Sequence, residues 1–282
     1  MPPVRIDARR AGGATASFTL DIDPTRNPRI TDHLSAGMLY EPDVGQAMLR
    51  IVRPGDTAID VGANVGFFTC LMGAVVGPEG RVVACEPDPD NLSTLARNIA
   101  LSDLHNVTLV TMPVTDVVGE VDFHFNSDGA DGHALWDPAL FPGNLRSIAT
   151  PRIRHIAATT LDAEVLSLGL ASPRLIKIDV EGAEHRVLQG AAGLLRGCRV
   201  PFVVAELHPF GLDLLGSSQM ELRGFMAGFG YDTFALYYSG ALPKLIPPGT
   251  LIELPHILNL LFSTPENVGA VWTVERHDPR NW

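Results

Sequence analysis

The residues best suited to chemistry stand where short apolar runs of the chain end. The first group occupies positions 60–66, DVGANVG, directly before a long apolar stretch. Glycines at a strand-to-helix junction let the backbone turn sharply and approach a ligand at the positive end of a helix. The third glycine of a dinucleotide fingerprint would fall at position 67, which is Phe67. This loop therefore favours a ligand with a cationic amino acid group and no phosphate, and it disfavours a nicotinamide dehydrogenase.

An acid follows this loop at the distance expected for a nucleoside contact. Glu86 comes about 20 residues after Gly66, at the end of the next apolar run. An acid there can accept hydrogen bonds from both hydroxyls of a ribose. The alternative is a tight structural turn and an unrelated surface acid, but the loop and the acid together are more specific than a glycine-rich loop alone.

A second acidic group lies in the segment 177–184, KIDVEGAE. The segment contains three acids, Asp179, Glu181 and Glu184. Favourable interaction with the positive end of a helix dipole does not by itself explain so many acids in six residues. Asp179 ends a predicted strand and faces the expected ligand. Glu181 and Glu184 are three residues apart, so on a helical turn they share one side. The structural alternative is an acid cluster in a first helical turn, with Lys177 as its partner.

The next apolar run ends in a further pair, Glu206 and His208. Residues two apart on a strand point to the same side. With Asp179 they would form either a general base or an Asp/Glu/His metal site. A lone histidine beside a proline is usually structural, so the pattern leaves the role of His208 open.

Alternating strands and helices position these groups. The alternation covers most of residues 57–236 and indicates right-handed βαβ units in a mainly parallel sheet. Ligands of such sheets bind beyond the carboxyl ends of the strands. The pattern predicts core strands at 57–61, 81–85, 107–112, 175–178 and 202–205, late strands at 231–236 and 270–274, an antiparallel pair at 121–125 and 153–157, and helices at 42–52, 67–76, 91–99, 161–168, 183–195 and from Ser218 to about 227.

Composition is typical of a globular protein. The 282 residues are 46% apolar and 19% charged, with a formal net charge of −11. We expect no general nucleic-acid or membrane-surface binding, because such proteins neutralise phosphates with Lys and Arg. Three cysteines without CxxC spacing argue against a disulfide framework or a zinc site. No apolar run reaches the ~18–20 residues that span a bilayer, and no signal-peptide core is visible. We therefore expect a cytoplasmic protein without membrane insertion.

Four segments together resemble a known family. DVGANVGFFT, CEPDPDN, KIDVEGAEHRVLQG and VVAELHP are similar to motifs of the FkbM family of S-adenosylmethionine-dependent methyltransferases, and the resemblance covers about residues 40–236. It implies a class I methyltransferase (Rossmann-like) α/β fold, a doubly wound sheet that is mostly parallel with an antiparallel last strand. It also implies S-adenosylmethionine as cofactor and methyl transfer to a hydroxyl of a sugar, polyketide or glycolipid.

The resemblance also implies cofactor contacts for individual residues of this chain. These are Asp60, Gly62, Asn64 and Gly66 around the methionine moiety, Glu86 at the ribose hydroxyls, Tyr40 and Glu41 at the amino group, Asp116 at the adenine edge and Asp179 facing the transferred methyl group. Tyr40 and Glu41 lie upstream of the first strand, ahead of the predicted helix 42–52, and the other residues lie at or after the carboxyl ends of predicted strands.

The chain is expected to be one methyltransferase domain, residues 36–282, after an N-terminal extension, residues 1–35. Segment 120–158 is predicted as an insertion with a β-hairpin, and residues 126–150 within it are longer than is typical of the family. Long ordered loops are often functional, so we expect His133, Trp136 and Glu181 to contact the acceptor; a plain surface excursion is the alternative. The apolar segment 242–261 is compatible with a homodimer contact or a pocket wall.

The mechanistic hypothesis is in-line displacement at a sulfonium methyl group by an acceptor oxygen. An alcohol is a poor nucleophile until its proton is being removed. His208 is the first choice as base because its ordinary pKa of about 6.5 suits that task, with Asp179, Glu206 and His133 as alternatives. Two other hypotheses remain: Asp179, Glu206 and His208 hold Mg²⁺ that positions a vicinal diol, or the protein binds the cofactor without catalysis.

Overall fold

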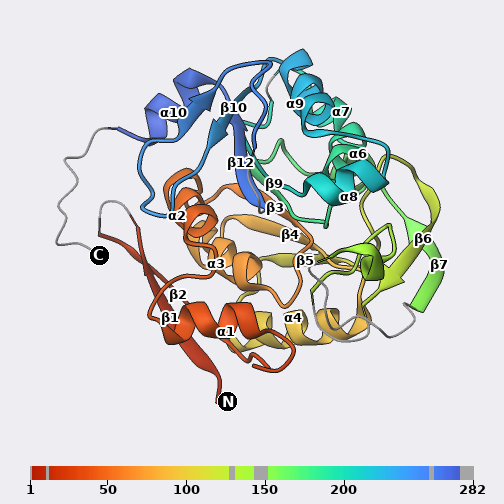
Figure 1. Cartoon of the computed structure of the whole chain (residues 1–282). Helices are drawn as coiled ribbons and strands as arrows, with labels where there is room; N and C mark the ends of the chain where they lie inside the picture. The colour runs from red at the N-terminus through yellow and green to blue at the C-terminus, as the bar shows by residue number, and fades with distance from the viewer. Residues whose placement is uncertain are drawn as a thin grey trace.

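The computed structural model describes residues 2–10, 13–126, 131–142, 152–197, 199–253 and 257–273 (Figure 1). Cys198 and residues 127–130 and 143–150 of the predicted insertion lie outside the described residues. None of the helices in the described ranges combines the length and the apolar composition that a membrane crossing requires.

An eight-stranded sheet forms the centre of the molecule, in the order β11-β10-β12-β9-β8-β3-β4-β5. Strands β9, β8, β3, β4 and β5 are parallel, whereas β12 runs antiparallel between β9 and β10. This is the predicted class I methyltransferase arrangement, including its antiparallel last strand, but the sheet has eight strands where the family resemblance implies seven. The strands are β3 (Thr57–Val61), β4 (Arg81–Cys85), β5 (Val107–Val110), β8 (Leu175–Ile178), β9 (Phe202–Leu207), β10 (Asp232–Ala235), β11 (Lys244–Ile246) and β12 (Leu258–Ser263).

Helices cover both faces of the sheet, as a doubly wound fold requires (Figure 1). One apolar cluster joins α2, α3 and α10 to one face, and a second joins α5 to α9 to the other. The central strands β8 and β9 are buried along their whole length, which explains their unbroken apolar sequences. The helices are α2 (Pro42–Ile51), α3 (Phe67–Val76), α4 (Pro89–Leu101), α5 (Leu161–Ser167), α6 (Glu184–Gln189), α7 (Ala192–Leu195), α8 (Pro209–Leu214), α9 (Gln219–Gly228) and α10 (Pro265–Val271).

The N-terminal residues take part in the main core. Strands β1 (Val4–Arg9) and β2 (Thr15–Leu20) form a hairpin, followed by α1 (Pro28–Ser35). Phe18 of β2 is buried and meets Phe67 of α3 edge to face, with ring centroids 5.6 Å apart. The core therefore continues across the boundary that the sequence placed at residue 35.

Two sequence-based element assignments were wrong. A strand was expected at 270–274, but residues 270 and 271 belong to α10, which begins after Thr264, the cap that accepts a hydrogen bond from the Asn267 amide; residue 274 lies outside the described residues. The helix expected at 183–195 is two helices, α6 and α7, separated at Gly190. A side chain at position 190 would collide with the carbonyl oxygen of Thr115, so the chain turns where the backbones touch.

The predicted inserted hairpin is present. β6 (Gly119–Phe125) pairs antiparallel with β7 (Arg152–Ala158) beside the main sheet. Residues 131–142, between the two strands of this hairpin, fold back along β6, where the backbones of His124 and Ala134 exchange two hydrogen bonds. This return brings insertion residues to the carboxyl ends of the central strands.

Candidate functional site

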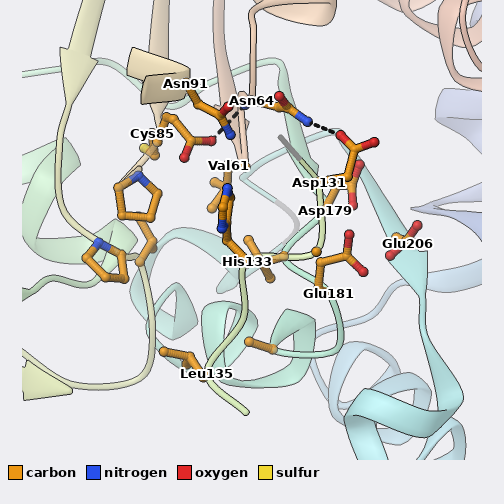
Figure 2. Close-up of a pocket in the computed structure, with 18 of the residues that line it drawn as sticks. Val61, Asn64, Cys85, Asn91, Asp131, His133, Leu135, Asp179, Glu181 and Glu206 are labelled. Carbon is orange, nitrogen blue, oxygen red and sulfur yellow. Dashed lines mark hydrogen bonds between the residues drawn. The ribbon is translucent and has the colours of Figure 1, made fainter. Parts of the chain in front are cut away.

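A pocket opens at the carboxyl ends of β3, β4, β8 and β9, where the sequence placed the chemistry (Figure 2). About 820 Å³ of space lies outside the protein atoms here, including the part open to solvent. Its walls come from four parts of the chain: the residues before α2, the strand ends, the β5–β6 connection and the insertion. Predicted site residues that line it are Tyr40, Glu41, Gly62, Asn64, Glu86, His133, Asp179, Glu181 and Glu206.

The glycine loop after β3 is a tight turn against the end of β8. Gly62 has φ +79°, and a side chain on it would collide with the carbonyl oxygen of Asp179. The amides of Gly62 and Ala63 both donate to the carbonyl oxygen of Cys85, at 3.0 Å each. Gly66 lies behind the pocket, where its Cα packs against Leu95 of α4. Gly62 therefore shapes the pocket, whereas Gly66 is needed for helix packing.

Glu86 is held in a fixed orientation by two backbone amides. Its Oε2 accepts from the Asn64 amide and its Oε1 from the Asp88 amide, both at 2.8 Å. Burial raises the pKa of Glu86 to about 7, against the lowering effect of these bonds. A carboxylate oxygen accepts more than one hydrogen bond. Glu86 can thus accept from two further hydroxyls without losing its support.

Asp60 has a structural place below the pocket and does not line it. It is fully buried, and its Oδ2 accepts from the Thr69 hydroxyl at 2.6 Å. Lys177 Nζ lies 3.5 Å from Asp60 Oδ1, 3.2 Å from Asp179 Oδ2 and 3.2 Å from the Gly62 carbonyl oxygen. Burial lowers the pKa of Lys177, but the charges of Asp179 and Asp60 outweigh it and keep this pKa above its ordinary value. The lysine therefore ties the ends of β3 and β8 together.

Glu41 presents an unpartnered oxygen to the pocket. It precedes α2 with φ +41°, and its Oε1 lies 3.7 Å from Arg29 Nη2. Its Oε2 is buried without a hydrogen-bond partner. Burial, followed by the charge of Asp179, raises the pKa of Glu41 to about 7. Tyr40 beside it packs on Phe67 and Phe68 of α3. The carboxylate can accept from a cationic donor such as an ammonium group.

One side of the pocket is apolar. Phe123 of β6 is buried there, and the remaining apolar wall is formed by Val61, Cys85, Pro87, Met112, Pro113, Val114 and Leu135. Such a slot suits a flat ring. Sequence reasoning missed these residues; only the alternation of β6, which turns Phe123 inward, gave a signal. His133 also lies here, and its Nδ1 accepts from the Asn126 amide at 3.0 Å.

The other side is acidic. Figure 2 shows Asp131, Asp179, Glu181 and Glu206 gathered on one side of the pocket, away from Cys85 and Asn91. Burial and then the charge of Asp179 raise the pKa of Glu181 to about 8 and that of Glu206 well above its ordinary range. Asp131, which sequence reasoning missed, accepts from Asn64 Nδ2 at 2.6 Å. The insertion is thereby joined to the glycine loop.

His208 and Trp136 lie behind this acidic side and do not line the pocket. His208 is 2% exposed, and its Nδ1 accepts from the Gly211 amide at 2.9 Å as the cap of α8. The neutral ring then carries its proton on Nε2, 3.7 Å from Glu181 Oε2. Trp136 Nε1 donates to the Glu181 carbonyl oxygen at 2.6 Å. This geometry gives both residues a supporting place and does not favour His208 as the base.

Two further expectations find no support in the geometry. Asp116 is exposed and outside the pocket lining, where it accepts from the Thr115 hydroxyl at 2.8 Å. Within the described residues, no three His, Cys, Asp or Glu side chains are arranged to hold a metal ion. Because His208 does not line the pocket and its Nδ1 already accepts from the Gly211 amide, the grouping of Asp179, Glu206 and His208 around Mg²⁺ is not favoured.

Comparisons with known proteins found methyltransferases among the relatives of this chain. A hexuronic acid methyltransferase of Haloferax volcanii is 28% identical over 61% of this chain and 64% of its own length. The 31-O-demethyl-FK506 methyltransferase FkbM of Streptomyces tacrolimicus is 30% identical over 61% of this chain and 73% of its own. A crystal structure of an FkbM methyltransferase from Methylobacillus flagellatus has a TM-score of 0.44 and 17% identity, covering 85% of this chain and 60% of that one.

The family model of the methyltransferase FkbM domain matches residues 60–233, more than half of the chain. This range begins at Asp60 in the glycine loop and ends within β10, so it contains the strand ends that form the pocket. The chain belongs to the FkbM methyltransferase family.

Proposed function

We propose that this protein transfers a methyl group from S-adenosylmethionine to a hydroxyl group of a small molecule or glycan. One observation carries the proposal: the same pocket holds a buried and oriented Glu86 and a Glu41 whose Oε2 has no hydrogen-bond partner. Two relatives support an oxygen acceptor, since one is named for a hexuronic acid and another for 31-O-demethyl-FK506.

The residues present fit S-adenosylmethionine. Glu86 would hold the ribose hydroxyls, and Glu41 Oε2 and Asn64 Oδ1, both buried without hydrogen-bond partners, would hold polar groups of the amino acid part. The apolar wall around Phe123 would cover the adenine ring. When bound, S-adenosylmethionine would supply a methyl group carried on a sulfonium sulfur. The acceptor oxygen would bond to the methyl carbon as the carbon–sulfur bond breaks, and the electrons of that bond would stay on sulfur.

Glu206 is the residue best placed to take the hydroxyl proton. Its Oε2 is buried in the pocket wall with no hydrogen-bond partner, and its raised pKa makes it a stronger base than an ordinary carboxylate. Asp179 is engaged by Lys177, and the Nδ1 atoms of His133 and His208 already accept backbone amides. Glu206 would therefore hold and deprotonate the hydroxyl, while the walls align it with the methyl group.

Calorimetry with S-adenosylhomocysteine, alongside NAD, tests the cofactor. We expect micromolar binding of the first compound alone. Glu206→Gln should lower methyl transfer to an acceptor found by screening sugars and polyketides by about 10²–10⁴-fold, while S-adenosylhomocysteine affinity stays within about threefold. Glu79→Gln, at an exposed turn, is the matched control. Unchanged turnover of Glu206→Gln would dismiss Glu206 as the base, and absence of binding would overturn the proposed function.

A further inference from the structure

The charges around the acidic side of the pocket do not balance. Arg29 is opposed by Glu41 at 3.7 Å, and Lys177 is shared between two carboxylates, Asp60 and Asp179. In the described part of the chain, no Lys or Arg nitrogen lies within ion-pair distance of Asp131, Glu181 or Glu206. The charge of Arg29 acts on all three of these acids, but none of them forms a direct ion pair with it within the described residues.

Glu206 shows that this space is built for a hydrogen-bond donor. The residue is 6% exposed, lines the pocket, and its Oε2 is buried without a partner. A buried polar atom costs about 1–3 kcal/mol when its partner is missing, so such atoms in native structures are normally satisfied by a ligand, water or ion. After burial, the strongest influences on the pKa of Glu206 are the charges of other carboxylates, Asp179 first, which makes a cationic or donor-rich partner more favourable still.

The proposed cofactor balances only part of this excess. S-adenosylmethionine carries a sulfonium, an ammonium and a carboxylate, hence one net positive charge. Glu41, with its unpartnered Oε2, is the acceptor suited to the ammonium group. Asp131, Glu181 and Glu206 remain for the acceptor. The raised pKa values of Glu181 and Glu206 keep protons on them in the free protein, and a protonated amine on the acceptor would favour their ionised forms, whereas a carboxylate on the acceptor would not.

We infer that the methyl acceptor bears a protonated amine near the hydroxyl that is methylated, as in an amino sugar, and that Asp131, Glu181 and Glu206 select it over neutral and acidic analogues. This inference rests on the proposed function. Asp131 enters from the insertion, Glu181 from the turn after β8 and Glu206 from β9, so the selecting groups surround the ligand from three elements. The Haloferax volcanii relative is named for a hexuronic acid, a sugar that carries a carboxylate and no amine, so the inferred acceptor differs from it in the sign of its charge.

Three hexoses that differ only at carbon 6 test the inference. The full chain is saturated with S-adenosylhomocysteine near neutral pH, and 6-amino-6-deoxyglucose, glucose and glucuronic acid are titrated by calorimetry. We expect the amino sugar to bind at least about tenfold more tightly than glucose, equivalent to about 1.4 kcal/mol, and glucuronic acid to bind most weakly. Glu181→Gln should reduce the preference for the amine about tenfold, whereas Glu79→Gln should leave it unchanged.

The outcomes separate the inference from the proposed function. Three results would overturn the inference if S-adenosylhomocysteine still binds normally: no preference for the amino sugar, no detectable binding of the amino sugar, or tightest binding of glucuronic acid. The cofactor assignment would stand in each case. A preference for the amine that survives Glu181→Gln at full strength would also overturn it. Failure to bind S-adenosylhomocysteine would instead reject the proposed function.

Discussion

Replacing Lys177 by methionine tests whether a buried lysine holds the two halves of the site together. Methionine keeps an unbranched apolar stem but removes the ammonium group, which lies within 3.5 Å of three oxygens and 5.1 Å from the centre of the Phe68 ring. The change leaves Asp60, which is fully buried, without its counter-charge.

The expected loss of stability follows from that burial. Removing one partner of a buried ion pair costs about 3–5 kcal/mol, because the other charge stays behind in a poorly solvated place. Asp60 retains only the hydrogen bond from Thr69, so we expect a loss of about 3 kcal/mol. With an m-value of about 3 kcal/mol/M, the urea midpoint should fall by about 1 M. Lys244→Met, at an exposed position of β11, should change stability by less than about 0.5 kcal/mol.

A double variant separates the charge from the packing. Asn at position 60 can still accept from the Thr69 hydroxyl, so Asp60→Asn combined with Lys177→Met should be more stable than Lys177→Met alone. The reasoning is refuted if Lys177→Met loses less than about 1 kcal/mol, or if the double variant is no more stable than the single one.

Two further predictions concern the turn after β3 and the pH dependence of stability. Gly62→Ala should lower the free energy of unfolding by more than about 2 kcal/mol and abolish S-adenosylhomocysteine binding, because the new side chain would collide with Asp179. The control is Gly77→Ala, at φ +66° with open space around it, which should keep binding and lose about 1 kcal/mol of stability. Equal losses of stability in urea melts would contradict this reasoning. Glu86 and Glu181, with pKa values raised from 4.5 to about 7 and about 8, keep protons in the folded protein that the unfolded chain has released, so stability should fall as pH rises from about 5 to 8. Thermal midpoints of the free protein should therefore be lower at about pH 8 than at about pH 6, and less so in Glu181→Gln; a midpoint that rises with pH would be evidence against it.

The position of the pocket could be predicted from the sequence because the ends of the strands depend on residues that are close together along the chain. Apolar runs of the right length and the glycine spacing at Gly62 depend on neighbours along the chain, and the structure places them as expected. The fate of individual polar side chains was harder to predict. The ordinary pKa of histidine suits a base, but burial lowers the pKa of His208, and the amide of Gly211 uses its Nδ1. Asp60 has the position of a cofactor ligand, but Lys177 covers it.

Contacts made by the insertion could not be predicted, since no motif or periodicity connects it to the strand ends. Asp131 reaches Asn64 and Trp136 reaches the Glu181 carbonyl oxygen across long stretches of sequence. Both contacts depend on the return of the chain along β6, which a single backbone pairing between His124 and Ala134 marks. Such pairings leave little signal in the residues themselves.

Close backbone packing explains why the acids of the pocket cannot move apart to relieve their repulsion. Glu181 has φ +55°, an unfavourable conformation for this residue type, and its carbonyl oxygen is held by Trp136. The next residue, Gly182, packs so closely on Gly211 that neither position has room for a side chain. The turn after β8 is therefore fixed from both sides, and Glu181 stays opposite Glu206. Relief must come from protonation or from a bound cation, which is why we expect the free protein to lose stability as these groups ionise and a cationic ligand to restore it.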